Sequence, residues 1–150
     1  MKKLLFSLLL LLHGGFALNA QEVESAPPIV TSSHDQDVRK ATEALTAKYD
    51  LSADQAKQMY TIQVRKKKNM AQIAALHASD PALYRAKAQN VQKGTLASIR
   101  RILQSKAQVD IYHKTQTETR MLRNKKQKEM GAKKASKEEI ETALLAIYEE

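Results

Sequence analysis

The sequence predicts an all-α fold of four to five amphipathic helices, arranged as two tandem helical hairpins. Ser-x-x-Gln occurs at Ser52 and again at Ser105, 53 residues later. In such a capping box the serine accepts from the N–H of the third helical residue, and the glutamine there bonds back to the serine N–H. Apolar residues recur every three or four positions, and no alternating β pattern competes. The spacing leaves room for a long helix, a turn and a second long helix.

The first two helices are predicted over residues 33–50 and 52–78. The first begins at a further Ser-x-x-Gln group and carries one apolar stripe. The stripe of the second is interrupted by four consecutive cations, which surround the helix, so one of them should lay its stem along the apolar side. The apolar positions are Val38, Ala41, Leu45 and Tyr49, followed by Ala56, Met59, Ile62, Met70, Ile73 and Leu76.

Three more helices are predicted after Asp80, Ser105 and Ser136. Asp80 is an N-cap followed by proline at the first helical position, where the missing N–H costs nothing. The helix from Ser105 should break at Gly131. The last helix starts with a Ser-x-x-Glu box and has the clearest amphipathic pattern. Its apolar positions are Ile140, Ala143, Leu144, Ile147 and Tyr148, and those of the two before it are Tyr84, Ala88, Val91, Thr95, Ile99, Ile102, Val109, Tyr112 and Leu122.

The apolar stripes are narrow, and the chain offers little large apolar volume. A monomeric bundle built from them would be marginal, because a small domain needs most of its apolar surface buried. We therefore expect an open, cradle-like arrangement or a homodimer that completes the core.

Residues 1–20 have the pattern of a secretory signal peptide. Lys2 and Lys3 precede the apolar residues 4–12, and small residues lead to a cleavage site near Ala20. Residues 21–32 include two prolines and predict a flexible segment, which leaves residues 33–150 as one helical domain. The signal predicts an exported protein. With 0 cysteines the protein has no disulfide or thiol chemistry.

The two Ser-x-x-Gln groups also carry a resemblance. Residues 51–55, Leu-Ser-Ala-Asp-Gln, resemble the L-[T/S]-x-x-Q motif of the Spy/CpxP family, which carries the motif twice at about this separation. In the second copy Leu103 and Gln108 lie five positions apart, where the family has four. The resemblance implies a small all-helical periplasmic protein, with Leu51, Ser52, Gln55, Leu103, Ser105 and Gln108 as motif residues.

The resemblance further implies that non-native proteins are bound without ATP on an adaptable apolar surface. The chain has 25 Lys and Arg against 16 Asp and Glu, which favours anionic partners. Methionine and tyrosine beside cations could provide such a surface. The candidate polypeptide- or anion-binding residues are Met59, Tyr60, Arg65, Lys66, Lys67, Lys68, Met70, Arg100, Arg101, Tyr112, Arg123, Lys125, Lys126 and Lys128. The expected partners are non-native or envelope polypeptides.

Other function classes fit less well. After the signal only Gly94 and Gly131 remain, which excludes glycine-rich phosphate loops, and no H-E-x-x-H motif occurs. We therefore expect no catalysis and no cofactor. Nucleic acid is not expected, because no aromatic residues are interleaved with the cations. Two alternatives remain: a basic structural module that docks on anionic lipid or polysaccharide through residues 123–134, and a heavy-metal-responsive protein with a weak site shared at a dimer interface.

Overall fold

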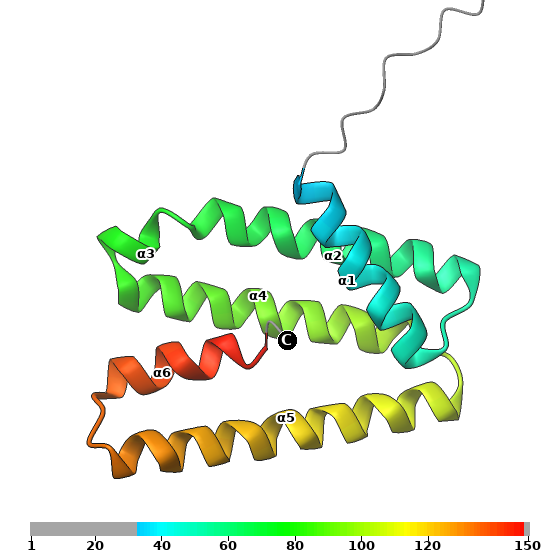
Figure 1. The fold of residues 1–150 in the computed structure, drawn as a ribbon. Helices are drawn as coiled ribbons and strands as arrows, with labels where there is room; N and C mark the ends of the chain where they lie inside the picture. The colour runs from blue at the N-terminus through cyan, green and yellow to red at the C-terminus, as the bar shows by residue number, and fades with distance from the viewer. Residues whose placement is uncertain (1–32, 149–150) are drawn as a thin grey trace, which may run out of the picture. The chain divides into compact units, whose positions relative to one another are not determined.

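The computed structural model describes residues 33–148, with side chains from Asp35 onward. The predicted signal peptide and the segment 21–32 lie outside the described residues. Within residues 33–148 the protein is all-α and contains no strand, which confirms the predicted class (Figure 1). The helices are α1 (Ser33–Tyr49), α2 (Ala53–Ile73), α3 (Leu76–Ser79), α4 (Pro81–Ile102), α5 (Lys106–Ala132) and α6 (Lys137–Ala146).

The helix starts lie where the sequence predicts them. Ser52, Ser105 and Ser136 are N-caps with complete capping boxes. Asp80 caps α4, since its Oδ1 accepts from the N–H of Leu83 at 2.9 Å. These bonds satisfy donors that a helix start would otherwise leave unpaired.

Two predicted helix ends are wrong. The helix predicted over residues 52–78 ends at Ile73, and α3 follows after a turn. There the N–H of Ala74 bonds to Ala71 O, three residues back, which tightens the last turn of α2. Gly131 does not break α5, which continues to Ala132, and the left-handed residue after it is Lys134 (φ 57°).

Helix α1 ends in a Schellman turn that leads directly into α2. Leu51 N–H bonds to Thr46 O at 3.0 Å, and Asp50 N–H bonds to Ala47 O at 3.4 Å. Asp50 adopts φ 49°, the left-handed conformation that this motif requires. The turn brings α1 back against α2.

The helices pack mainly in neighbouring pairs. Helices α2 and α4 lie side by side and are joined through α3, while α5 turns back into α6 (Figure 1). Helix α1 packs on α2 and touches α5, and α6 also touches α4. The core lies at the end of the α2–α4 pair where α1 ends and α5 begins. It consists of Tyr49, Met59, Ile62, Ile99 and Leu103, with Leu45, Leu51, Ile102, Val109, Ile111 and Tyr112 packed around them.

Candidate functional site

The two Ser-x-x-Gln boxes meet through their glutamines. The amides of Gln55 and Gln108 bond to each other in both directions, Nε2 to Oε1 at 3.0 Å each way. Both side chains are buried, at 5% and 7% exposed. We call this pair, with the backbone groups it bonds, the glutamine junction. It joins the start of α2 to the start of α5 across 53 residues of chain.

Each glutamine of the junction uses its remaining hydrogen-bonding capacity on backbone groups. Gln55 Nε2 donates to Ile102 O at 2.6 Å, and Gln108 Nε2 donates to Asp50 O at 3.0 Å. Their Oε1 atoms accept from the N–H groups of Ser52, Gln104 and Ser105 at 3.0–3.2 Å. A buried amide is tolerated only when it is satisfied in this way. The motif residues therefore fix the scaffold around the site.

Beside the junction lies a cavity of about 470 Å³, which we call the trough. Its lining comes from α1, α2, α4 and α5, together with the C-terminal residues Ile147 and Tyr148. A volume of this size is typical of ligand sites, which span roughly 300–1,000 Å³. The trough is lined by Asp37, Lys40, Ala41, Ala44, Leu45, Lys48, Tyr49, Gln63, Lys66, Gln92, Thr95, Leu96, Ile99, Thr115, Gln116, Thr119, Ile147 and Tyr148.

Helix α1 presents two parallel stripes to the trough. Lys40, Ala44 and Lys48 are spaced by four and are exposed, so the two ammonium groups lie at the rim, about 12 Å apart along the helix. The neighbouring stripe of Ala41, Leu45 and Tyr49 becomes progressively buried and continues into the core. This wall is cationic at its edge and apolar below.

The wall formed by α5 is neutral and polar, with Thr115, Gln116 and Thr119 half-buried. Burial raises the pKa of the Tyr49 phenol, and a hydrogen bond with Thr115 partly offsets this. The α5 residues of the lining carry no charge, and the one carboxylate of the lining, Asp37, is paired with Lys67. The arrangement suits a guest with both acidic and apolar groups.

Several candidate residues from the sequence lie in the interior. Met59 is 0% exposed, and Tyr112 packs against the core with its hydroxyl 3.4 Å from Leu96 O. Burial raises the pKa of the Tyr112 phenol. The structure therefore corrects the placement of Met59 on a binding surface, because Met59 lies in the core, whereas Tyr112 is partly buried against that core.

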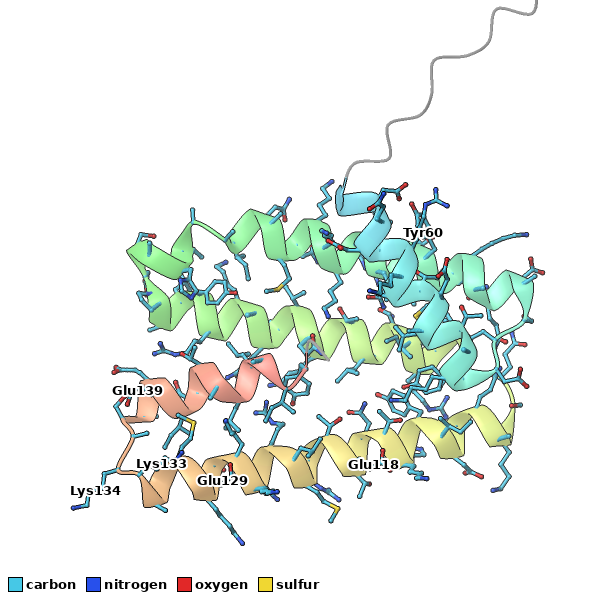
Figure 2. All side chains as sticks on the ribbon, in the orientation of Figure 1. Tyr60, Glu118, Glu129, Lys133, Lys134 and Glu139 are labelled. Carbon is cyan, nitrogen blue, oxygen red and sulfur yellow. The ribbon has the colours of Figure 1, made fainter. Side chains whose placement is uncertain are left out.

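Tyr60 joins α2 to α1. Its hydroxyl donates to Asp35 Oδ1 at 2.8 Å, and the same carboxylate pairs with Arg39 (Figure 2). The bond from Tyr60, followed by that from Arg39, lowers the pKa of Asp35, and the same bond raises the pKa of Tyr60. Tyr60 thus contributes to the attachment of α1.

Three of the candidate cations link helices. Arg65 donates to Ser98 Oγ at 2.7 Å, which joins α2 to α4. Lys67 pairs with Asp37 at 2.6 Å, which joins α2 to α1. Arg123 donates to Leu144 O and lies 4.4 Å from the centroid of the Tyr148 ring, which joins α5 to α6. Of the candidates, Lys66 alone lines the trough, and Met70 is half-buried.

The other candidate cations face solvent. On α5, Met121 and Leu122 are 66% and 54% exposed, so the predicted inward place of Leu122 is wrong. Between Glu118 and Glu129 every side chain except Thr119 and Arg123 is exposed, although α6 packs along this half of α5 (Figure 2). Lys125 forms only a long, 4.0 Å pair with Glu129. The exposed candidates are Lys68, Arg100, Arg101, Lys125, Lys126 and Lys128.

Most trough residues were not among the predicted site residues. A usable signal existed in α1, where Lys40, Ala44 and Lys48 repeat every four residues beside an apolar stripe. In α4, Thr95 and Ile99 lie on the predicted stripe, but no sequence signal marks Gln92, Thr115 or Gln116, which become a lining only when the helices meet.

Residues 33–148 contain no group of three or more metal-ligating side chains. In the same part of the chain, no helix has both the length and the apolar character needed to cross a bilayer. Comparison with protein-family models, with curated proteins and with solved structures found no match.

Proposed function

We propose that the protein is an exported polypeptide-binding protein that works without ATP, as a chaperone or an envelope-stress adaptor of the Spy/CpxP type. The observation that carries the proposal is the trough, with lysines at one rim and aliphatic side chains below. An acidic unfolded segment would be attracted by the excess of Lys and Arg over Asp and Glu, which remains after Lys2 and Lys3 leave with the signal, and would place its apolar side chains over Leu45 and Ile99.

The proposed setting is the periplasm, and the guests are non-native or envelope polypeptides. The proposed architecture is an open, cradle-like pair of tandem helical hairpins, which a second copy of the chain would complete as a homodimer. The small main cluster of buried apolar residues, at one end of the α2–α4 pair, supports such an open form.

The test is suppression of aggregation of a reduced or acid-unfolded client by the purified mature protein, measured by light scattering at low and high ionic strength. We expect protection that weakens with salt, because exposed charges are screened. The variant Lys40→Gln/Lys48→Gln removes the rim charges. Lys126→Gln/Lys128→Gln removes the same charge far from the trough and serves as the control.

The rim variant should lose several-fold more protection than the control variant. Equal losses would assign the effect to net charge rather than to the trough. No protection by the unaltered protein at several-fold molar excess would contradict the proposed function.

A second candidate function is docking on an anionic envelope surface. It is favoured by the exposure of α5 around Lys125, Lys126 and Lys128, beside the exposed Met121 and Leu122. Binding to vesicles with anionic lipid should collapse between low and high salt. If Lys125→Gln/Lys126→Gln/Lys128→Gln bound the vesicles as well as the unaltered protein, this candidate would be excluded.

A further inference from the structure

Helix α6 is packed differently from the other long helices. Of the five described helices with ten or more residues, it alone has no buried residue. An isolated helix shorter than about 12–15 residues is marginal in water. Helix α6 has ten residues, so its order depends on what it docks against.

The contacts of α6 are few and largely polar. Arg85 of α4 pairs with Glu141 at 3.2 Å, with the arginine side chain 11% exposed. Gln92 of α4 donates to Tyr148 O at 3.0 Å. From α5, Arg123 donates to Leu144 O and lies over the Tyr148 ring. Three side chains of the body therefore hold both ends of the segment.

The surface beneath α6 continues the trough. A second cavity, of about 20 Å³, lies there and is lined by Lys66, Met70, Tyr84, Ala88, Gln92, Leu145 and Tyr148. Lys66, Gln92 and Tyr148 line both cavities. If α6 moved away, the two cavities would form one groove along α4.

Charge matches the segment to its surface. Residues 136–150 contain five glutamates and one lysine in a chain that is otherwise strongly basic. The surface beneath presents the cations Arg85 and Arg123, with Lys66 lining both cavities. Helix α6 is thus an acidic amphipathic helix on a cationic groove.

We propose that this surface, formed by Met70, Arg85, Ala88, Gln92 and Arg123 and here called the α6 seat, is an interaction surface for an acidic amphipathic helix of a polypeptide guest. Helix α6 is its resident occupant, and a guest displaces it. A guest fits when it offers an aliphatic stripe, a carboxylate toward Arg85 and an aromatic ring toward Arg123. The inference rests on the proposed function only for the nature of the guest.

Displacement is selective because α6 is attached to the chain. A tethered segment competes at an effective concentration in the millimolar range. The apparent affinity for a guest is lowered by the fraction of molecules in which α6 covers the seat. Substitutions in the α6 segment that weaken its contacts with the seat should therefore increase guest binding. Substitutions in the seat itself should decrease it.

The experiment measures the fluorescence anisotropy of a labelled peptide of residues 135–150 added to the full mature chain. The lid variant Glu141→Gln/Tyr148→Ala loosens α6 and leaves the seat intact. The seat variant adds Arg123→Gln to the lid variant. Lys114→Gln, which removes one exposed charge from α5, is the matched control, and Tyr148→Ala alone is a second, milder lid variant.

The lid variant should bind the peptide about tenfold more tightly than the unaltered chain, the factor given by losing 1.4 kcal/mol of hold on α6. The seat variant should lose that gain, and Lys114→Gln should change the affinity less than about twofold. Equal binding by both lid variants and the unaltered chain, or full binding by the seat variant, would overturn the inference. Circular dichroism establishes that each variant is folded.

This outcome is separable from that of the aggregation assay, because the probe is a defined helix and not an unfolded client. Tight peptide binding without client protection would contradict the proposed function and leave the α6 seat standing. Client protection without the expected difference in peptide binding between the lid and seat variants would support the proposed function and contradict the α6 seat.

Discussion

The two ends of the helical unit contain the same local motif with different results. Ser52, Ser105 and Ser136 all form complete capping boxes. At the first two, the third helical residue is a glutamine that lies buried in the glutamine junction. At the last it is Glu139, which is exposed and whose pKa is lowered by the backbone N–H of Ser136 and by the Ser136 side chain.

The difference lies in the charge of the capping side chain and in the hydrogen-bond donors that it has left once the box is closed. After its Oε1 has closed the box, a glutamine still has two N–H donors and no charge, so it can be buried against a carbonyl and a second amide. A glutamate has no donor left and carries a charge that burial would penalise. The box starts a helix in either case, but only the neutral amide also joins it to another helix.

The largest effect should follow from exchanging these two residue types. Gln108→Glu removes the donor to Asp50 O and buries a carboxylate, and we expect about 3–5 kcal/mol loss of unfolding free energy, as for an uncompensated buried charge. Glu139→Gln should leave stability almost unchanged, because this side chain is exposed. Urea denaturation measures both.

The pH dependence gives a second check on that exchange. Burial should raise the pKa of the carboxyl group introduced by Gln108→Glu, so the stability deficit of this variant should shrink as the pH falls through that pKa. A deficit that is the same at pH 4.5 and pH 8 would contradict burial of the charge.

The second comparison sets Met59 of α2 against Met121 of α5. Met59→Ala leaves a cavity in the core and should cost about 2–5 kcal/mol. Met121→Ala, at a side chain 66% exposed, should cost less than about 0.5 kcal/mol. Thermal unfolding measured by circular dichroism is sufficient, and similar losses for the two variants would mean that α5 is covered where the structure exposes it.

The third comparison concerns the stability of the protein at alkaline pH. Burial raises the pKa of Tyr49 and Tyr112 above the value in the unfolded chain, so above about pH 10 the unfolded state loses these protons first. Their contribution to stability is complete below pH 10 and is lost as the pH rises. Tyr49→Phe should flatten the fall in urea midpoint between pH 9 and pH 11, whereas Tyr84→Phe should not. An unchanged slope in Tyr49→Phe would contradict burial as the cause.

The smallest expected effects concern the two left-handed residues. Asp50→Gly should stabilise the protein by about 0.5–1 kcal/mol, because glycine adopts positive φ without the steric cost of a side chain. Lys134→Gly relieves the same strain in the turn before α6. Neither this turn nor α6 contributes a residue to the core cluster. Its gain should appear mainly as slower amide exchange in α6, with little change in global unfolding. Equal global gains would show that both ends of the unit unfold together.

The sequence predicts the helix starts well because a capping box is complete within four residues. Ser52 with Gln55 and Ser105 with Gln108 require no distant partner to be recognised. That the two glutamines then bond to each other was not predictable, since it depends on how α1 and α4 end.

Burial was harder to predict than secondary structure. Met59 and Leu122 both lie on apolar stripes, and only the packing decides that one is covered and the other is not. The break after Ile73 has no glycine or proline to mark it, and the left-handed Lys134 is unusual for its residue type. The trough depends on four helices meeting, which no local pattern encodes.

The reciprocal amide pair has an evolutionary consequence. Neither Gln55 nor Gln108 can be exchanged alone without leaving the partner amide and at least two backbone groups unsatisfied. Substitutions at the two positions should therefore be correlated in evolution. A genetic selection that randomises both codons should recover particular pairs of residues rather than residues chosen independently at each position.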